Sequence, residues 1–252
     1  MSDDDFFIGW SAETPKVDRR FFLSAGLALL AGTGATAGLI AAHQKAPGRG
    51  TWNQGDVRTF RGIITGNPYA MLRTTDLDGT PKTALLSCLG KCGVAARIGA
   101  LEGQPVTIQG SVIQRGPHVM IAVIDGLDWI APAPPMETDA ALAFPAFNAL
   151  GDVTLSGEIL DTKCWFGAMR PSEGKVHKAC AALCIRGGLP PAFLATDREN
   201  RRRLLIMTDR DAAHGETLLP LVADPVRMSA TVKQRGDLLF LDGPVSAIQR
   251  LT

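Results

Sequence analysis

The sequence lacks the short motifs that mark common hydrolytic and nucleotide-binding sites. It contains no Gly-x-Ser-x-Gly nucleophile elbow, no Walker phosphate-binding loop and no dinucleotide-binding fingerprint. Each of these motifs places a nucleophile or a phosphate-binding backbone at a defined turn, so its absence removes that chemistry from the candidates. We therefore do not expect an enzyme of these classes, and we favour a protein without catalytic activity.

Aromatic residues and net charge are also scarce. Tyr69 is the single tyrosine, and 26 Lys and Arg residues against 25 Asp and Glu residues give a formal net charge of +1. A protein that binds single-stranded nucleic acid through stacking needs exposed aromatic side chains and a basic groove. From this balance we expect no nucleic acid among the partners. Hydrophobic residues make up 46% of the chain, which excludes a disordered protein.

The longest uncharged stretch lies near the N-terminus, at residues 21–42. Its length matches the ~20 residues that a helix needs to cross a bilayer. The motif Arg19-Arg20-x-Phe22-Leu23 begins just before this stretch and overlaps its first residues. It resembles the twin-arginine export signal. We expect a retained, single-pass anchor in the bacterial inner membrane, with the N-terminus inside and the later domains in the periplasm.

Two short segments flank this predicted anchor. Residues 1–20 form an expected cytoplasmic tip, in which Phe6, Phe7, Ile8 and Trp10 make an apolar cluster that can lie in the membrane interface or contact a partner. Residues 43–55 are polar and rich in glycine, and they are expected to be a linker.

An internal repeat organises the remainder of the chain. Residues 84–122 align without gaps with residues 204–242, at an offset of 120, whereas Gly62 and its neighbours align with Gly157 at an offset of 95. The second copy therefore carries 25 additional residues between these two aligned regions. Those residues fall in the stretch at 163–193.

Each copy has the pattern of short strands interrupted by one short helix, which in the first copy is predicted at 93–101. Five strands with a helix between the third and the fourth is the order of the OB-fold, a small Greek-key barrel. The expected fold is mainly β: an N-terminal transmembrane helix followed by two tandem OB-fold-like five-stranded barrels. They span residues 56–131 and 152–252, with a connector at 132–151, and the second barrel contains a Cys/His-bearing helical insert.

The insert at 163–193 holds the candidate site. A helix predicted at 175–186 places His177, Cys180 and Cys184 on one face, and Cys164 precedes it in the chain. This residue set is suited to an iron–sulfur cluster, zinc or copper. A disulfide from Cys164 to Cys180 or to Cys184, and free thiols, are the alternatives. Asp161, just before the insert, is expected to face solvent.

A second pair of cysteines occurs in the first copy, between its third strand and its predicted helix. Cys88 and Cys92 have three residues between them. The binuclear copper electron-entry site has this spacing but also needs His and Met shortly downstream, and residues 93–103 contain neither. We expect a Cys88–Cys92 disulfide in a tight loop.

The arrangement of one anchor, β domains and cysteine-bearing loops is similar to that of Rieske iron–sulfur subunits. No cysteine here is followed by x-His, however, and no Cys-x-x-Cys-His occurs, so neither a Rieske cluster nor covalent haem is expected. The leading hypothesis is a non-catalytic, membrane-anchored periplasmic accessory subunit of a respiratory or other redox complex. The alternatives are an electron-transfer or metal-binding protein, and a metal or haem chaperone.

Overall fold

A computed structural model describes residues 15–43, 50–75, 79–126, 128–197, 199 and 201–251. The chain divides into two compact units, Met1–Pro47 and Gly48–Thr252, which are described separately. The predicted aromatic cluster of Phe6, Phe7, Ile8 and Trp10 and the linker residues 44–49 lie outside the described residues.

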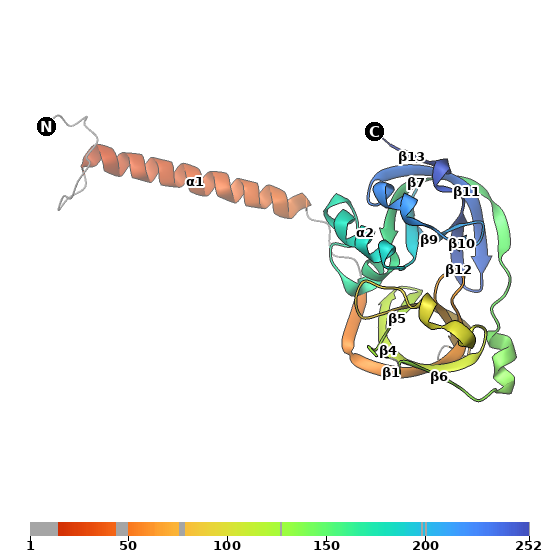
Figure 1. Cartoon of the computed structure of the whole chain (residues 1–252). Coiled ribbons are helices and arrows are strands. Elements are labelled where there is room, and N and C mark those ends of the chain that lie inside the picture. The colour runs from red at the N-terminus through yellow and green to blue at the C-terminus, as the bar shows by residue number, and fades with distance from the viewer. Residues whose placement is uncertain are drawn as a thin grey trace. The chain divides into compact units, whose positions relative to one another are not determined.

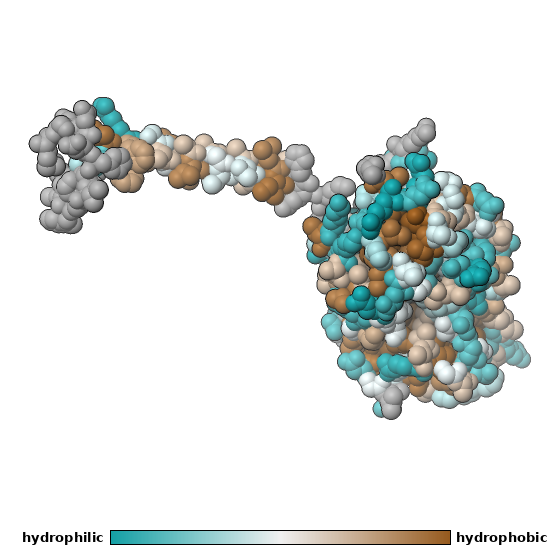
Figure 2. Space-filling view, turned by 45° about the horizontal axis from the view of Figure 1, so that its top comes forward, coloured by the Kyte–Doolittle hydropathy of each residue, from teal (hydrophilic) through white to brown (hydrophobic). Residues whose placement is uncertain are grey.

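The first unit contains one long helix, α1 (Lys16–His43), which begins earlier than the predicted span. Its apolar side chains are exposed, as the brown and pale surface along its length shows (Figure 2). Residues 16–42 are long and apolar enough to cross a membrane, as predicted. An N-terminal signal sequence meets the same criterion of length and composition.

The second unit begins with a barrel (Figure 1, orange to lime). Its strands are β1 (Thr51–Thr65), β2 (Met71–Thr75), β3 (Pro81–Ser87), β4 (Pro105–Arg115), β5 (His118–Val123) and the short β6 (Ile130–Pro132). The pairings run β1-β2-β3-β5-β4 and return from β4 to β1, which closes a five-stranded barrel. Only β3 and β5 pair in parallel. This strand order is that of the OB-fold, so the mainly β, OB-like prediction is confirmed for this barrel.

Two details of this barrel differ from the prediction. The helix expected at 93–101 is a pair of short 3₁₀ helices, η1 (Ala95–Arg97) and η2 (Gly99–Leu101), because Gly99 has a φ of +53° that a continuous α-helix does not allow. In addition, β1 extends back into the predicted linker. Thr51 and Trp52 pair with Gln114 and Ile113 of β4, so the end of that segment is part of the sheet.

A second sheet follows the first. Its strands are β7 (Asn148–Asp161), β8 (Pro191–Thr196), β9 (Arg202–Asp209), β10 (Ala212–Ala213), β11 (Pro225–Arg235), β12 (Leu238–Asp242) and β13 (Ile248–Arg250). The order is β10-β9-β12-β11-β7-β8, and β9 also pairs with β8. Because β7 starts at Asn148, part of the expected connector at 132–151 belongs to this sheet. Three 3₁₀ helices complete the connections: η3 (Glu137–Leu142), η6 (Glu216–Leu221) and η7 (Val245–Ala247).

The cysteine-bearing residues lie between β7 and β8. They form the π-turn η4 (Cys164–Ala168), the 3₁₀ turn η5 (Lys175–His177) and the helix α2 (Lys178–Arg186), so the predicted helix at 175–186 is present with a 3₁₀ first turn. After α2 the chain passes through Gly187 and Gly188 into β8. The segment between β7 and β8 is therefore fixed at both ends, because these two strands are neighbours in one sheet.

Four apolar clusters lie within the described residues of the second unit, and the smallest consists of Cys164, Cys184 and Leu189. One fills the first barrel with residues such as Ile64, Ile108 and Trp129, and another fills the second sheet with residues such as Phe193 and Met207. The third combines side chains of both. It contains Tyr69, Met71, Leu85, Ile113 and Met120 from the first barrel and Leu160, Trp165, Phe166, Leu194, Ile206 and Phe240 from the second. The two sheets thus share a buried junction.

Tyr69 supplies a polar connection inside this junction. Its hydroxyl donates to the carbonyl of Met207 at 2.7 Å and accepts from the backbone N–H of His214 at 3.2 Å. Burial raises the pKa of Tyr69 well above its ordinary value, so the hydroxyl keeps its proton. The single tyrosine therefore joins the first barrel to β9 and the segment after it.

A close backbone contact joins the loop after β3 to the end of α2. The N–H of Gly93 donates to the carbonyl of Gly187 at 2.8 Å. A Cβ atom added to Gly187 would overlap the carbonyl of Lys91, and one added to Gly93 would overlap that of Gly188. Glycine is therefore required at this contact because the two backbones approach too closely for a side chain.

We predict that Gly187→Ala lowers the free energy of unfolding by about 1–3 kcal/mol, because the new methyl group forces the loop and the helix apart. The matched control is Gly90→Ala in the same loop, whose Cβ would meet only the Cys88 sulfur, at an ordinary 3.6 Å. Urea unfolding of the two variants and the parent protein measures the difference. Equal stability of the two variants would show that the contact is not close in solution.

Candidate metal centre

Cys164 lies at the start of the turn after β7, and its backbone is fixed by the preceding strand. Its N–H donates to Oδ1 of Asp161 at 2.8 Å, and the other carboxylate oxygen, Oδ2, lies 3.0 Å from Nε2 of His177. All three residues are buried. The expectation that Asp161 faces solvent is wrong, because this carboxylate holds the turn and the beginning of the helical segment together.

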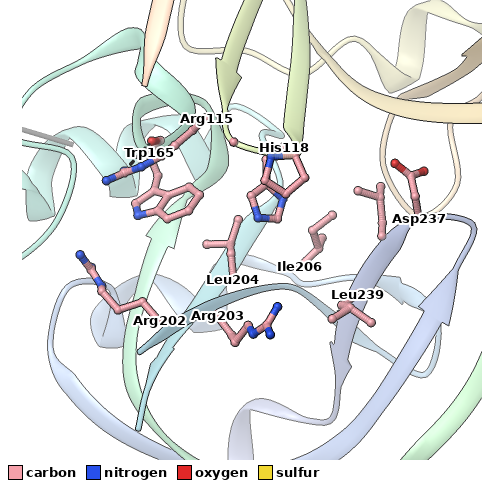
Figure 3. A pocket seen from close by; sticks show the side chains of 12 residues that line it. Arg115, His118, Trp165, Arg202, Arg203, Leu204, Ile206, Asp237 and Leu239 are labelled. Atoms are coloured by element: carbon pink, nitrogen blue, oxygen red, sulfur yellow. Dashed lines mark hydrogen bonds between the residues drawn. The ribbon is translucent and has the colours of Figure 1, made fainter. Parts of the chain in front are cut away.

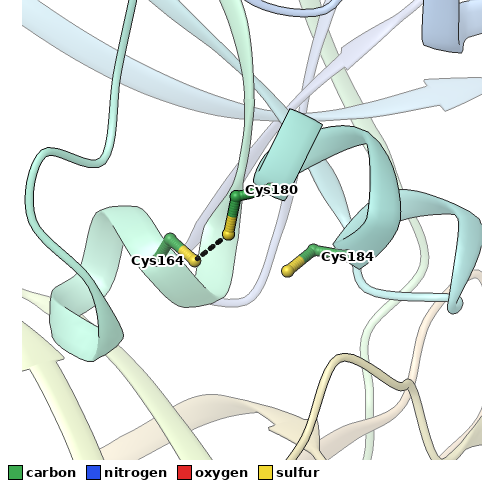
Figure 4. A group of neighbouring side chains, drawn as sticks. All are labelled: Cys164, Cys180 and Cys184. Carbon is green, nitrogen blue, oxygen red and sulfur yellow. Dashed lines mark hydrogen bonds between the residues drawn. The ribbon is translucent and has the colours of Figure 1, made fainter. Parts of the chain in front are cut away.

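Cys180 and Cys184 lie one turn apart on α2 and face Cys164 (Figure 4). The three sulfur atoms all lie within 4.8 Å of one another. Cys164 and Cys184 are buried, and Cys180 is half-buried. The helix spacing accounts for the pair on α2, but Cys164 joins them only because the chain folds back from β7.

The three cysteines are free thiols in this structure. The sulfur atoms of Cys164 and Cys180 lie 3.8 Å apart, well beyond the roughly 2 Å of a disulfide bond. The expected disulfide from Cys164 to Cys180 or to Cys184 is therefore not formed here. By contrast, the predicted disulfide between Cys88 and Cys92 is present, with Cα atoms 5.4 Å apart.

His177 is hydrogen-bonded to Asp161 and does not belong to the three-sulfur group. It belongs to a second group, Asp161, Cys164 and His177, whose potential ligand atoms also lie within 4.8 Å of one another. The predicted set of Cys164, His177, Cys180 and Cys184 is thus divided between two groups. One contains the three sulfur atoms, the other contains Asp161 and His177, and Cys164 belongs to both. Met169, which the sequence did not single out, lies at the rim of the sulfur group, with its Sδ 3.4 Å from the sulfur of Cys180.

Two lysines bring positive charge to the sulfur atoms. Lys91, from the Cys88–Cys92 loop, places Nζ 2.6 Å from the sulfur of Cys180 and 3.9 Å from that of Cys184. The hydrogen bond with Cys180 raises the pKa of Lys91, and the other thiols add to this effect.

Lys163 precedes Cys164 and is buried. Its Nζ donates to the carbonyls of Cys88, Leu89 and Gly90 at 2.6, 2.8 and 2.7 Å. Burial lowers the pKa of Lys163 to about 8, while Cys184, Cys164 and Asp161 act in the opposite direction. The three carbonyls satisfy all three ammonium donors and connect the disulfide loop to the thiol group.

The thiols influence one another strongly. The interaction with Cys164 lowers the pKa of Cys184, and Lys91 acts in the same direction against burial. The pKa of Cys164 is raised, first by its interaction with Cys184 and then by burial. The two shifts therefore favour a thiolate at Cys184 over one at Cys164.

The sequence analysis named Cys164, His177, Cys180 and Cys184 as site residues. It did not assign a role at the site to Asp161, Lys91, Lys163 or Met169. Two of these positions carry a weak signal, since Lys91 lies inside the short Cys88–Cys92 loop and Lys163 is adjacent to Cys164. Nothing in the sequence alone indicates that these two segments meet. Their contact is a product of the junction between the two sheets.

Neither a known protein family nor a curated protein matches the sequence. Among solved structures, the chain is similar to a deletion mutant of the single-stranded DNA binding protein from Thermus aquaticus. The match has 14% sequence identity and a TM-score of 0.24, and it covers 81% of this chain and 96% of that one.

This match corrects one expectation, the exclusion of nucleic acid as a partner. The matched protein is described as a single-stranded DNA binding protein, and the exclusion of nucleic acid as a partner is withdrawn. At this identity and TM-score the likeness carries no argument about what the present chain binds.

We predict that Lys163→Met lowers the free energy of unfolding by about 3 kcal/mol, because three carbonyls, one of them buried, lose a charged hydrogen-bond donor. Lys175→Met is the matched control, since Lys175 is exposed on the same segment and its replacement should change stability by less than about 0.5 kcal/mol. Denaturant unfolding under conditions that keep the Cys88–Cys92 disulfide intact measures both. An effect no larger than that of the control would mean that the buried ammonium does not hold the loop.

Proposed function

We propose that this chain is a membrane-anchored protein that binds a soft metal ion, Cu(I), through the thiolates of Cys164, Cys180 and Cys184. The observation that carries this proposal is the convergence of three sulfur atoms to within 4.8 Å of one another. Thiolate ligands select Cu(I), zinc and iron–sulfur clusters among biological metals. The choice among these three rests on the atoms around the sulfur group.

The surroundings of the site favour Cu(I) over the two alternatives. The nearest additional donor is the thioether of Met169, which is a soft ligand. Zinc sites commonly take a fourth ligand from His or a carboxylate, and neither His177 nor Asp161 belongs to the group that the three sulfur atoms form. Iron–sulfur clusters are held by four cysteines in the common types, and Cys88 and Cys92 are joined in a disulfide.

Charge balance supports the same ion. Three thiolates and one monovalent copper would carry two negative charges, which are costly to bury without compensation. Lys91 and Lys163 supply two positive charges at the site, one directly at the sulfur atoms and one behind the adjacent loop. The half-buried position of Cys180 leaves a route by which an ion reaches the thiols.

The location and the role in a complex are part of the proposal. The helix α1 is long and apolar enough to span a membrane, and the twin-arginine-like segment and the Cys88–Cys92 disulfide support export to an oxidising compartment. We place the protein at the inner membrane with its sheets in the periplasm. There it serves as a non-catalytic accessory subunit of a respiratory or other redox complex and presents the bound ion to a partner.

We also infer that the two sheets arose by tandem duplication. The bounds of β4 and β11, Pro105–Arg115 and Pro225–Arg235, differ by the 120 residues of the sequence repeat. The ring of pairings β7-β8-β9-β12-β11, with β11 returning to β7, has the same order as the first barrel. The cysteine-bearing segment is then an insertion between the first two strands of the second copy, and the metal site is an addition to the fold.

We predict that the full-length protein, purified without oxygen and titrated with Cu(I) against a competing chelator, binds one ion per chain. Serine in place of Cys164, Cys180 or Cys184 should weaken binding on the order of 100-fold or more, because each removes a ligand. The double substitution of Cys88 and Cys92 by serine removes no proposed ligand, so it should keep the one-to-one stoichiometry and weaken binding less than any of the three single substitutions, through a less restricted loop around Lys91 and Lys163. If the protein isolated without oxygen contains a Cys164–Cys180 disulfide and its cysteines do not react with a thiol reagent, the metal-binding proposal is contradicted.

The accessory role has a separate test. We predict that the protein extracted from its native membrane in a mild detergent elutes in a complex several times larger than the chain with its micelle. Cross-linking and mass spectrometry of that fraction identify the partners. A stable monomer from the native membrane would contradict the subunit role and leave the metal site unaffected.

A further inference from the structure

The cysteine-bearing segment between β7 and β8 has an apolar outer surface. Among the described residues of the second unit, six large apolar side chains are exposed, and three of them lie in this segment. They are Met169, Val176 and Leu183, which are 42%, 84% and 50% exposed. Single exposed apolar residues are ordinary, but several gathered in one short segment indicate a surface that contacts something.

Two of these side chains share the exposed face of the helical segment formed by η5 and α2. Val176 and Leu183 are seven residues apart, and Cys180 lies between them at helical spacing, so the three occupy one face. Ala179 is also exposed there. The sulfur of Cys180 lies 3.4 Å from Sδ of Met169. We call these five residues together the α2 face.

Free positive charge lies along one side of the α2 face. Lys175 and Arg186 are both exposed and are eleven residues apart, which is about three helical turns, so they lie on the same side. Neither has an ion-pair partner among the described residues. Their charges are therefore available to an anionic surface.

The neighbouring carboxylates are already paired with other cations. Glu173 is the only acidic residue in the segment 163–193, and it forms an ion pair with Arg202. Asp224, beside the helix, lies 2.9 Å from Nζ of Lys178 and 3.0 Å from Nε of Arg250. The α2 face thus combines apolar side chains with uncompensated positive charge, which is the composition of a surface that lies on anionic lipid headgroups.

The chain enters the second unit beside this face. The carbonyl of Gly50 accepts a hydrogen bond from the guanidinium group of Arg170, the residue after Met169. A Cβ atom added to Gly50 would overlap the carbonyl of Phe166, so the two backbones are in direct contact. Residue 50 is therefore fixed to the turn that carries Met169.

That turn is itself fixed to the first barrel. Trp165 and Phe166 belong to the core shared by the two sheets. NH1 of Arg115, at the end of β4, donates to the carbonyl of Trp165 at 2.8 Å, and the guanidinium carbon lies 4.1 Å from the centre of the indole ring. Figure 3 shows these two side chains together. The α2 face is therefore carried by a rigid support.

The distance from this support to α1 is limited by the length of the chain. Six residues, 44–49, connect Gly50 to His43, the last residue of α1. Seven steps of fully extended chain span at most about 25 Å, whatever the conformation of these residues. When α1 spans a bilayer, the turn beside the α2 face is therefore confined near its surface. A tethered surface of this kind needs only weak affinity to stay bound.

From these observations we propose that the α2 face docks on the surface of the bilayer that α1 spans. Val176 and Leu183 enter the boundary between headgroups and acyl chains, and Lys175 and Arg186 lie at anionic headgroups. This inference rests on the membrane anchor of the proposed function. It also extends that function, because Cys180, the half-buried thiol of the metal site, then opens at the membrane surface. The ion is exchanged there with a partner in the same membrane.

Quenching of tryptophan fluorescence by lipids with brominated acyl chains tests the docking. The full-length protein is placed in nanodiscs of phosphatidylcholine and phosphatidylglycerol. In Leu183→Trp, the emission added relative to the parent should fall about twofold or more with brominated lipid, because an indole at this position lies in the interface. The matched control is Leu150→Trp. Leu150 is 53% exposed and lies near the opposite end of β7 from the cysteine-bearing segment, so its added emission should not change.

Charge reversal provides a second arm of the same experiment. Lys175→Glu together with Arg186→Glu, in the protein that carries Leu183→Trp, should reduce the quenching by about half or more in nanodiscs that contain phosphatidylglycerol. In nanodiscs of phosphatidylcholine alone, the same double substitution should have little effect. Equal effects in the two lipids would contradict the role of the two cations.

Elution of the parent protein together with the nanodiscs tests the anchor by itself. Protein that elutes free of lipid would contradict both the anchor and the docking. Incorporation with equal quenching of the Leu183→Trp and Leu150→Trp variants would overturn the docking alone. Protection of the Leu183→Trp variant from acrylamide only in the complex extracted from the native membrane, without quenching by brominated lipid, would assign the α2 face to a protein partner and overturn the docking as well.

Discussion

The buried ammonium of Lys163 is the interaction on which the candidate metal centre depends. Burying a charge is unfavourable unless every donor is satisfied, and here three carbonyls of the Cys88–Cys92 loop accept its hydrogen bonds. The disulfide restricts that loop to a conformation in which the three carbonyls point the same way. A bond in the first barrel thus fixes the position of the residue next to Cys164, and it also brings Lys91 to the sulfur atoms.

The shared core explains why such contacts persist. Two barrels joined only by a connector would move relative to each other, but here large side chains of both sheets form one buried cluster. The Tyr69 hydroxyl adds two hydrogen bonds inside it. The sulfur group uses this rigidity, since it has Lys91 from one sheet and its cysteines from the segment between two strands of the other.

The parts of the fold that follow local patterns were predictable from the sequence. The strand at 105–115 begins with an alternation of polar and apolar residues, and the strand at 118–123 is a run of apolar residues after His118. The turn between them contains Gly116, which has a φ of +56°. The predicted helix at 93–101 was wrong because propensity alone does not register the backbone conformation of Gly99. Cys180 and Cys184 were correctly placed together, since they lie one turn apart on a short helix. The buried partners Asp161, Lys163 and Lys91 were not predictable, because each is defined by a contact between distant segments.

The number of thiols decides between the two chemistries open to this site. A disulfide from Cys164 to Cys180 would use two sulfur atoms and leave Cys184 as a buried, unpaired thiol. It would also remove the Cys164 thiol, whose interaction with Cys184 is the first cause of the lowered pKa of Cys184. A metal ion uses all three sulfur atoms at once. Three convergent thiols beside two ammonium groups are therefore better matched to an ion than to a disulfide.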